Sequence, residues 1–339
     1  MQIHENFSLK PLNTFAIAAK TRFFASFSSV EELQNLLNTK YFIDGNQPII
    51  LGGGSNILFT KDVDGFVLKN DLRGISVVAE DDVFYYVKAA AGEVWHQLVE
   101  YCLQHNYAGL ENLSLIPGNV GASPMQNIGA YGVEIKDVFH ELEALHIKEK
   151  YLRTFSLEEC AFGYRESIFK TTLKNQFIIL NVTFKLRKAP VFNTSYGAIE
   201  QELNKMEVTA LSIQHIAQAV IQIRQSKLPD PKVMGNAGSF FKNPTICAAS
   251  FTSLQQQWPT IPFYEVSQQL YKIPAAWLIE QCGFKGYRKG DAGCNPLQPL
   301  VLVNYGTASG AEIVALSQMI IDAVQNRFGI VLEREVNIL

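Results

Sequence analysis

Residues 115–132 read LIPGNVGASPMQNIGAYG, and this stretch decides most of what the sequence predicts about the fold. It interleaves four glycines with amide and hydroxyl side chains: Gly118, Asn119, Gly121, Ser123, Gln126, Asn127, Gly129 and Gly132. The stretch has too much glycine for the interior of a helix or strand, and too many apolar residues for a solvated linker. Because the buried backbone groups of a loop must be hydrogen-bonded, a bound ligand with many polar atoms would satisfy them. Taken alone, the stretch fits a ligand-binding loop and a loop packed against its own domain equally well.

A second glycine-rich loop lies upstream, where Leu51-Gly-Gly-Gly-Ser-Asn56 follows an apolar strand expected at 47–51. Three glycines let the backbone approach a bulky group and point successive N–H donors at it, which suits a pyrophosphate. Ser55 and Asn56 add side-chain donors. The pattern is neither GxGxxG nor GxxxxGK(S/T), and an extended stretch is expected at 57–59, whereas a helix follows the loop in Rossmann and Walker sites. A hairpin turn is the alternative interpretation.

Downstream of both loops, Phe162-Gly-Tyr-Arg-Glu-Ser-Ile-Phe169 places Arg165 among aromatic residues. A guanidinium binds carboxylates and phosphates in bidentate fashion through its planar fork. Arg165 is therefore a candidate oxyanion clamp. A surface ion pair with Glu158 or Glu159 is the alternative interpretation.

A fourth stretch, Gly235-Asn-Ala-Gly-Ser-Phe-Phe-Lys-Asn-Pro244, presents Ser239 between a glycine and two phenylalanines, with Asn243 as a nearby donor. The stretch contains no GxSxG elbow and no histidine, so a Ser-His-Asp hydrolase is poorly supported. Ser239 is either an accessible functional hydroxyl or a turn serine.

Composition narrows the class of protein. The 339 residues include 29 Lys+Arg and 32 Asp+Glu, so the net charge is -3 and an anionic ligand must be held by local donors, not by a basic surface. No apolar run approaches the ~20 residues that span a membrane, and the N-terminus lacks the apolar core of a signal peptide. The 5 cysteines form no CxxC pair, and the 6 histidines show no metal-binding spacing. We therefore expect a cytoplasmic enzyme that binds no nucleic acid, membrane or metal.

The length predicts about two domains, at about 150 residues per domain. A strand rich in aromatic and β-branched residues is expected at 83–89, and a half-buried strand with period-2 alternation at 178–186. The main boundary is expected after Leu186, and the prolines within 227–232 predict a rigid, extended segment that includes Lys227. Capping residues predict four helix starts, at Ser29, Ser212, Pro274 and Ser309.

The four motifs occur together and in order, with Asn13-Thr-Phe15 near one end of the chain and Leu332-Glu-Arg-Glu-Val336 near the other. In this combination the sequence closely resembles the UDP-N-acetylenolpyruvoylglucosamine reductase family, type I branch, over nearly its whole length. The resemblance implies an α+β fold: an FAD-binding unit of the vanillyl-alcohol-oxidase (PCMH) type with two subdomains, and an α+β substrate-binding domain. The implied boundaries are 1–187 for the FAD-binding unit, with subdomains of about 1–69 and 70–187, a linker with a substrate-closing tyrosine loop at 188–211, and a substrate domain at 212–339 whose C-terminal strand returns to the flavin site.

The resemblance also supplies cofactors and residue roles. It implies dissociable FAD and NADPH as co-substrate, and it implies FAD contacts from Gly52, Gly53, Gly54, Ser55, Asn56, Pro117, Gly118, Asn119, Gly121, Ala122, Ser123, Gln126, Asn127, Gly129, Ala130 and Ile179. The implied substrate-binding residues are Tyr131, Tyr196, Arg224, Lys227 and Asn243. The implied catalytic residues are Arg165, Ser239 and Glu335.

The implied reaction reduces UDP-N-acetylglucosamine enolpyruvate to UDP-N-acetylmuramate for peptidoglycan synthesis, carried out by a cytoplasmic monomer. NADPH reduces FAD, flavin N5 delivers hydride, Arg165 and Glu335 polarise the substrate carboxylate, and Ser239 supplies the proton. Two alternatives stay open: a flavin oxidase of the same superfamily, and a non-catalytic nucleotide-sugar sensor. The sequence departs from the family pattern at Asn337, where relatives often carry an arginine.

Overall fold

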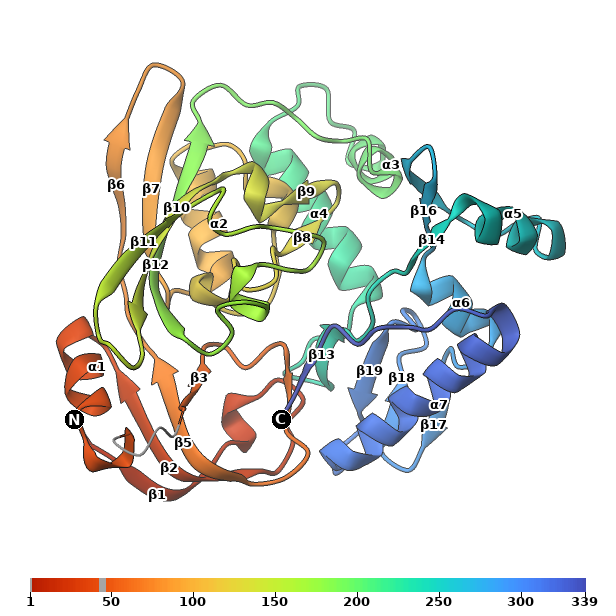
Figure 1. Ribbon diagram of the computed structural model, residues 1–339. Coiled ribbons are helices and arrows are strands. Elements are labelled where there is room, and N and C mark those ends of the chain that lie inside the picture. The colour runs from red at the N-terminus through yellow and green to blue at the C-terminus, as the bar shows by residue number, and fades with distance from the viewer. Residues whose placement is uncertain (1, 43–46) are drawn as a thin grey trace. The chain divides into compact units, whose positions relative to one another are not determined.

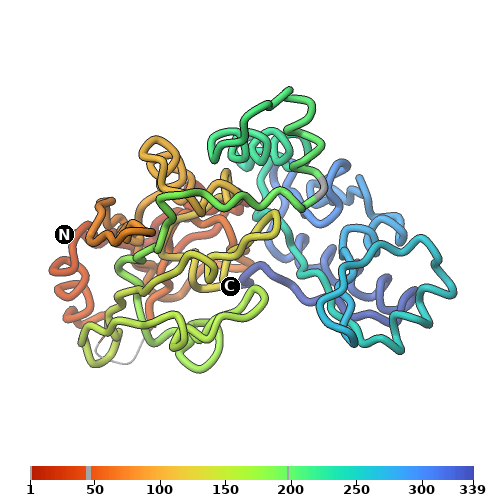
Figure 2. The backbone as a smooth tube through the Cα atoms, turned by 90° about the horizontal axis from the view of Figure 1, so that it is seen from above, coloured from red at the N-terminus to blue at the C-terminus, as the bar shows by residue number. Residues whose placement is uncertain are grey.

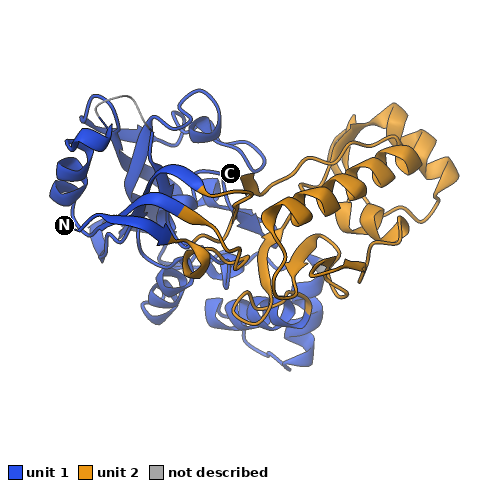
Figure 3. Ribbon diagram, turned by 90° about the horizontal axis from the view of Figure 1, so that it is seen from below, with its two compact units in different colours: residues 1–7, 21–53, 63–226 blue, residues 8–20, 54–62, 227–339 orange. Residues whose placement is uncertain are grey.

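The structure is a computed structural model that describes residues 2–42 and 47–339. The chain divides into two compact units (Figure 3). Unit 1 contains Met1–Phe7, Thr21–Gly53 and Val63–Ser226, and unit 2 contains Ser8–Lys20, Gly54–Asp62 and Lys227–Leu339. Each unit therefore combines segments that are far apart in the sequence.

The first sheet of unit 1 has the strand order β1-β2-β5-β3 within the described residues (Figure 1). Its strands are β1 (His4–Ser8), β2 (Lys20–Phe27), β3 (Ile49–Leu51) and β5 (Val63–Asn70). Strand β5 pairs in parallel with both β2 and β3. Helix α1 (Val30–Leu37) buries three leucines in the same core cluster as sheet residues Phe66 and Leu68. The first glycine loop thus leaves from the carboxyl end of the short edge strand β3.

The second sheet of unit 1 has the order β11-β10-β12-β7-β6 within the described residues, and its pairings are antiparallel. Its strands are β6 (Ile75–Glu80), β7 (Phe84–Ala90), β10 (Phe139–His146), β11 (Leu152–Ser156) and β12 (Phe177–Arg187). Helix α2 (Trp95–Gln104) packs against the sheet through Trp95 and Leu98. Strand β12 is more buried than the half-buried strand that we predicted, since Ile179 and Thr183 are 6% and 2% exposed. The reason is that Ile178 and Ile179 point into two different core clusters.

The remaining helices of unit 1 are α3 (Gly197–Lys205) and α4 (Ile213–Lys227), which pack against each other through Ile199 and Val220. Helix α3 begins directly after Tyr196, in a segment where the sequence predicted only a linker. Lys227 is the last residue of α4, so the extended conformation predicted for it is wrong. Pro229 restricts only the residue directly before it, which is Leu228. Short elements shape the loops: η1 (Lys10–Leu12), η2 (Lys40–Phe42), η3 (Glu111–Leu113), η4 (Val120–Ala122), β8 (Gly129–Ala130), β9 (Val133–Glu134), η5 (Ile135–Asp137) and η6 (Ile168–Lys170).

Unit 2 contains the sheet β13-β19-β18-β17 and the smaller sheet β14-β16-β15 within the described residues. Helix α7 (Gly310–Phe328) starts with the predicted capping box of Ser309 and Glu312 and buries an apolar stripe that includes Ile313 and Ile320. No helix of the described residues is long and apolar enough to cross a membrane. The other elements of the unit are β13 (Gly235–Ser239), β14 (Thr245–Cys247), α5 (Ala248–Gln257), β15 (Tyr264–Ser267), β16 (Leu270–Lys272), α6 (Ala275–Gln281), β17 (Arg288–Lys289), β18 (Ala292–Cys294) and β19 (Val301–Asn304).

The end of the chain pairs with a segment near its beginning. Strand β20 (Asn337–Ile338) pairs in parallel with β4 (Ile57–Leu58), and Figure 2 shows the blue C-terminal end returning to this early segment. Strands β3 and β4 flank the first glycine loop but belong to different sheets. The loop is therefore not a hairpin turn.

Candidate active site

The second glycine loop is held in shape by Asn127, which is fully buried in unit 1. Its Nδ2 donates to Glu134 Oε2 and to Gly163 O, both at 2.9 Å, and its Oδ1 accepts from Lys136 N at 3.1 Å. Asn127 thereby connects the loop to the segment that carries Arg165. The loop is both packed against its own unit and attached to a candidate catalytic segment.

Asn119 brings the two glycine loops together within unit 1. Its Nδ2 donates to Gly92 O at 2.7 Å. A Cβ added to Gly52 would lie 3.3 Å from Asn119 Cβ, and one added to Gly53 would lie 2.8 Å from Asn119 Oδ1. Because the second loop lies directly against them, a side chain would clash at Gly53 and would fit only tightly at Gly52.

The rest of the first loop, Gly54 to Asn56, belongs to unit 2. Gly54 has a φ of +63°, and a Cβ there would lie 2.0 Å from Leu12 O. The carbonyl of Gly54 accepts from Thr14 N at 3.0 Å and from Thr14 Oγ1 at 3.3 Å. Because protein donors already engage this carbonyl, the loop is suited to offer N–H groups to an anion.

We expect Gly54→Ala to lower FAD affinity at least about tenfold, because the new Cβ would clash with Leu12 O and force the loop to shift. Flavin content after purification and a fluorescence titration with FAD measure the effect. Gly290→Ala is the matched control, since Gly290 has a φ of +60° but a Cβ there meets nothing within 4 Å among the described residues. A Gly54→Ala protein that retains flavin as well as Gly290→Ala would contradict the prediction.

Arg165 lies beside the second glycine loop in unit 1. Its Nη2 donates to Gly129 O at 2.7 Å, and its guanidinium lies 5.3 Å from the ring centroid of Tyr164. Its backbone has a φ of +56°, a strained conformation for a residue with a side chain. Glu159, one partner considered in the surface ion-pair interpretation, pairs with Arg153 at 2.9 Å. The structure therefore places Arg165 at the predicted FAD loop.

The segments that carry Ser239 and Glu335 are hydrogen-bonded to each other in unit 2, although they are far apart in the sequence. Glu335 N donates to Phe240 O at 2.8 Å, and Lys242 N donates to Glu333 O at 2.9 Å. The Glu335 main chain is thus hydrogen-bonded to the residue that follows Ser239. Ser239 is exposed at the end of β13, and Glu335 is half-buried. The neighbouring carboxylate of Glu333 forms a salt bridge with Lys242 and is 70% exposed, so Glu335 is the better catalytic candidate.

Three predicted substrate-binding residues form a cluster in unit 1. The rings of Tyr131 and Tyr196 lie 5.6 Å apart at an interplanar angle of 81°, and the Tyr131 hydroxyl is hydrogen-bonded to the Arg224 side chain. Burial lowers the pKa of Arg224. Its Nε is buried and has no hydrogen-bond partner among the described residues. Since an unpaired buried donor costs about 1–3 kcal/mol, an acceptor on a ligand would be favoured there.

The sequence did not predict the two asparagines that hold this cluster. Asn112 Nδ2 donates to Tyr131 O at 3.0 Å and to Asn193 O at 2.9 Å. Asn193 Nδ2 in turn donates to Gly132 O at 3.1 Å. Together they fix the backbone that leads to Tyr196. Residues 110–115 read LENLSL, in which polar residues stand beside leucines, so nothing in the sequence singled out Asn112.

The predicted substrate-binding residues Lys227 and Asn243 lie in unit 2. Lys227 is exposed, and Asn243 Oδ1 accepts from the first N–H of α6 at 2.9 Å, which leaves its Nδ2 as a donor. Gln298 was not predicted, but its Oε1 is buried without a partner among the described residues. It precedes β19, in which Val301 is paired with Ser239. Gln298 is therefore a buried, unpaired acceptor three residues before the strand residue that pairs with Ser239.

The other predicted FAD contacts lie in the second loop, apart from Ile179. The Ser123 hydroxyl donates to Val120 O at 2.6 Å, so it stabilises the loop itself. Ile179 is buried in β12, and its carbonyl accepts from Asn70 Nδ2 at 3.2 Å. These FAD contacts stay predictions, as do Pro117, Gly118, Gly121, Ala122, Gln126 and Ala130.

His96 on α2 supports the start of the second loop and was also missed. Its Nδ1 accepts from Leu115 N at 3.0 Å, and Leu115 has a φ of +59°. Burial lowers the pKa of His96, an effect that Glu100 opposes and Arg224 reinforces. A neutral imidazole is required for this bond, because a protonated Nδ1 cannot accept.

We expect the loop to lose stability as the pH falls below about 6.5, the ordinary pKa of histidine. A histidine whose folded pKa is lowered takes up its proton more readily when unfolded, so the loss continues down through the folded pKa. His96→Gln keeps an acceptor that does not titrate. Between pH 7.5 and pH 5.5 the thermal midpoint of His96→Gln should fall by about 2–4 °C less than that of the wild type. Parallel curves for the two proteins would exclude this role of His96.

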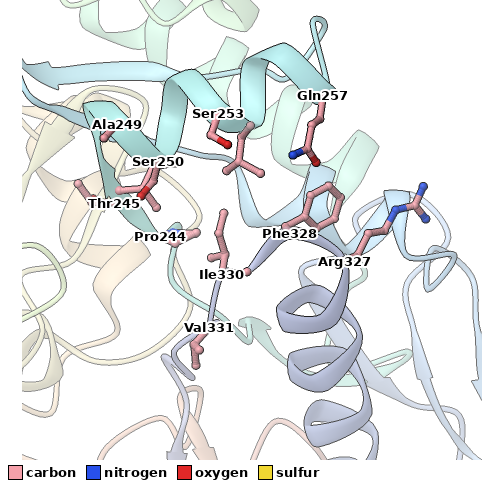
Figure 4. A pocket seen from close by; sticks show the side chains of 13 residues that line it. Pro244, Thr245, Ala249, Ser250, Ser253, Gln257, Arg327, Phe328, Ile330 and Val331 are labelled. Carbon is pink, nitrogen blue, oxygen red and sulfur yellow. The ribbon is translucent and has the colours of Figure 1, made fainter.

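A hollow of about 750 Å³ in unit 2 lies between α5, the residues that follow Asn243 and the end of α7 (Figure 4). Ser253 and Gln257 line it from α5, and Phe328 and Ile330 from the other side. Ser239 and Glu335 are not among its lining residues. We assign the hollow no part in the reaction.

Comparisons with known protein families identify the class of the chain. Residues 22–154 match a family model described as an FAD binding domain. Both glycine loops lie within this match, and the class of the chain is that of FAD-binding oxidoreductases.

The particular family follows from the rest of the chain. Residues 230–339 match the C-terminal domain model of UDP-N-acetylenolpyruvoylglucosamine reductase. Proteins of that name from Flavobacterium johnsoniae and Amoebophilus asiaticus are 51% and 50% identical, and the matches cover 100% of both chains in each case. The chain belongs to the UDP-N-acetylenolpyruvoylglucosamine reductase family. A crystal structure of the Thermus caldophilus enzyme has a TM-score of 0.70 at 22% identity and covers 100% of this chain and 99% of its own. The fold class predicted from the sequence is thus confirmed.

Proposed function

We propose that this protein reduces UDP-N-acetylglucosamine enolpyruvate to UDP-N-acetylmuramate with NADPH and bound FAD, in peptidoglycan precursor synthesis. The observation that carries the proposal is the hydrogen bond from Glu335 N to the carbonyl of Phe240, the residue after Ser239, in a chain of this family. A flavin oxidase would keep the glycine loops but would not need this serine and glutamate beside each other. A nucleotide-sugar sensor would not need them either.

The residues present fit FAD. A Cβ on Gly53 would lie 2.8 Å from Asn119 Oδ1 and 3.0 Å from Gly118 Cα, and one on Gly54 would lie 2.0 Å from Leu12 O, so both positions admit only bare backbone. Backbone N–H groups of such loops, with Ser55 and Asn56, suit a pyrophosphate. When bound, FAD would take up hydride from NADPH and deliver it from N5 to the enolpyruvyl group.

The catalytic side chains divide the remaining work. Arg165 would hold the substrate carboxylate, where negative charge accumulates during hydride delivery. Glu335 would support the same group and must be protonated or hydrogen-bonded there, because a bare carboxylate would repel it. Ser239 would give its hydroxyl proton to the carbon next to the carboxylate. A hydroxyl is a weak acid, but an enolate carbon is basic enough to accept its proton.

Substrate binding is assigned to the five predicted residues and to Gln298. Arg224 would donate from its unpaired Nε to an anionic part of the substrate, and Tyr131 would help to orient that part. Tyr196 would close over the substrate. Lys227 and Asn243 would contribute a charge and an amide donor to the diphosphate and sugar. Gln298 would add a buried acceptor.

The test is NADPH oxidation followed with and without the enolpyruvyl UDP-sugar, after recording the flavin spectrum of the purified protein. The expected result is a flavin spectrum and NADPH oxidation that depends on the UDP-sugar, with one UDP-N-acetylmuramate formed for each NADPH consumed. A protein without flavin after FAD addition, or oxidation of NADPH indifferent to the UDP-sugar, would exclude this function.

We also propose a cytoplasmic monomer that binds neither nucleic acid nor membrane. All 5 cysteines lie in the described residues and are free thiols, which suits a reducing compartment. The net charge of -3 offers no general attraction to nucleic acid or to anionic lipid. Light scattering on the purified protein measures the oligomeric state.

A further inference from the structure

The residues beside Glu335 have side-chain partners of their own. Arg334 reaches helix α7, and Asn337 reaches the first glycine loop, all within unit 2. Neither contact was expected from the sequence. These contacts bear on how the Glu335 carboxylate is held.

Arg334 is bound to two consecutive residues of α7. Its Nε donates to Ser317 Oγ at 2.8 Å, and its Nη2 donates to Gln318 Oε1 at 2.7 Å. Ser317 is fully buried, and its hydroxyl donates to Val314 O at 2.7 Å, so its lone pair is oriented toward Arg334. Gln318 is fixed in turn by Asp322 at 2.8 Å. Two charge-assisted bonds to prearranged acceptors make a firm anchor.

Asn337 forms the second anchor, on the other side of Glu335. Asn337 N and Nδ2 donate to Asn56 O at 3.1 and 2.9 Å, and Asn56 Nδ2 donates back to Glu335 O at 3.4 Å. The pairing continues to the end of the chain, where Thr60 N donates to Leu339 O at 2.7 Å. The main chain of Glu335 is thus linked directly to a residue of the predicted pyrophosphate loop.

We propose that Arg334 and Asn337 are positioning residues for Glu335, and that Asn337 also couples the FAD loop to that glutamate. This inference rests on the role of Glu335 in the proposed function. A side chain misplaced by about 1 Å can cost a factor of 10² in rate, so the two anchors set how well the carboxylate meets the substrate. Binding of FAD to the loop at Asn56 would stabilise the same hydrogen bonds that hold Glu335.

The test separates the two half-reactions by stopped flow, with FAD affinity and thermal midpoint measured on the same holoenzymes. Arg334→Met keeps an aliphatic side chain and removes the guanidinium. It should slow flavin reoxidation by the UDP-sugar about 10- to 100-fold, while FAD affinity and flavin reduction by NADPH stay unchanged. Arg334→Lys should recover part of the rate. Asn337→Asp removes the donor at the same size, and it should slow reoxidation and also weaken FAD binding about three- to tenfold. Asn326→Ala, an exposed asparagine on α7, is the matched control and should behave as wild type.

A double variant distinguishes positioning from general support of the fold. If Arg334 acts through Glu335, then Arg334→Met should add little to the loss already caused by Glu335→Gln. Full additivity, or equal losses in both half-reactions, would overturn the inference. If Glu335→Gln slows reoxidation but Arg334→Met and Asn337→Asp do not, only this inference fails. If Glu335→Gln has no effect, the catalytic role of Glu335 fails, and the inference fails with it.

Discussion

Ser239→Ala is expected to slow reoxidation of the reduced flavin by the UDP-sugar about 10³-fold, while flavin reduction by NADPH keeps its wild-type rate. The hydroxyl is exposed at the end of β13 and lies directly before Phe240, which binds the Glu335 main chain. Removal of a positioned general acid typically costs 10²–10⁴-fold, and only the half-reaction that needs its proton should be affected. Rapid mixing of the oxidised enzyme with NADPH, and of the reduced enzyme with substrate, measures the two rates separately.

Two further serine variants sharpen this result. Ser239→Cys keeps a proton donor at the same place and should retain more activity than Ser239→Ala. Ser253→Ala changes an exposed serine on α5 that lines the hollow without an assigned role, and it should leave both rates unchanged. Equal damage to both half-reactions in Ser239→Ala would mean that the serine supports the structure and donates no proton.

Local rules predicted several helix boundaries from the sequence. Ser309 and Glu312 form their reciprocal capping box at the start of α7, and α6 follows Pro274 as expected. At Ser29 the cap also forms, but Glu32 reaches back to Ser28 N at 2.7 Å, one residue earlier than the motif predicts. Such signals succeed because donor and acceptor are separated by only a few residues, so their geometry does not depend on the rest of the fold.

The contacts that assemble the site could not be predicted in this way. The pairing of β4 with β20 joins residues near opposite ends of the chain, and each strand alone has only two residues, too few for a pattern. Asn112 acts through two hydrogen bonds to loop backbones and His96 through one, and such bonds leave no periodicity in the sequence. The roles of the glycine loops and of the candidate catalytic side chains were predicted because their combination resembles a family. Their physical supports became visible only with the fold.

The extended conformation predicted for Lys227 shows a different kind of limit. A proline restricts only the residue directly before it. Lys227 precedes Pro229 by two positions, so the rule applies to Leu228 and not to Lys227. Helix α4 therefore continues through Lys227, whose position is fixed by the helix and not by a rigid extended segment. When the rule is applied one residue too early, a candidate substrate-binding residue is assigned to the wrong element.

The second large effect is expected from removing the last five residues, 335–339. Turnover should fall below about 10⁻³ of the wild-type rate, since the loss of Glu335 alone removes a group that stabilises developing charge. FAD affinity should fall as well, because the truncated chain lacks β20 and with it the donors to Asn56 O and the acceptor for Thr60 N. Turnover with NADPH and the UDP-sugar, and a fluorescence titration with FAD, measure the two losses.

Glu335→Gln separates these two contributions. It removes the charge but keeps the main-chain bond to Phe240, the side chain of Asn337 and the pairing with β4, so it should reduce turnover without weakening FAD binding. If the truncated protein binds FAD as tightly as Glu335→Gln does, then β20 does not stabilise the glycine loop. If the truncated protein keeps more than about one hundredth of wild-type turnover, the glutamate is not part of the catalytic machinery. With both losses observed, the C-terminal residues carry two separable functions: a carboxylate for the substrate, and a strand that holds the flavin loop.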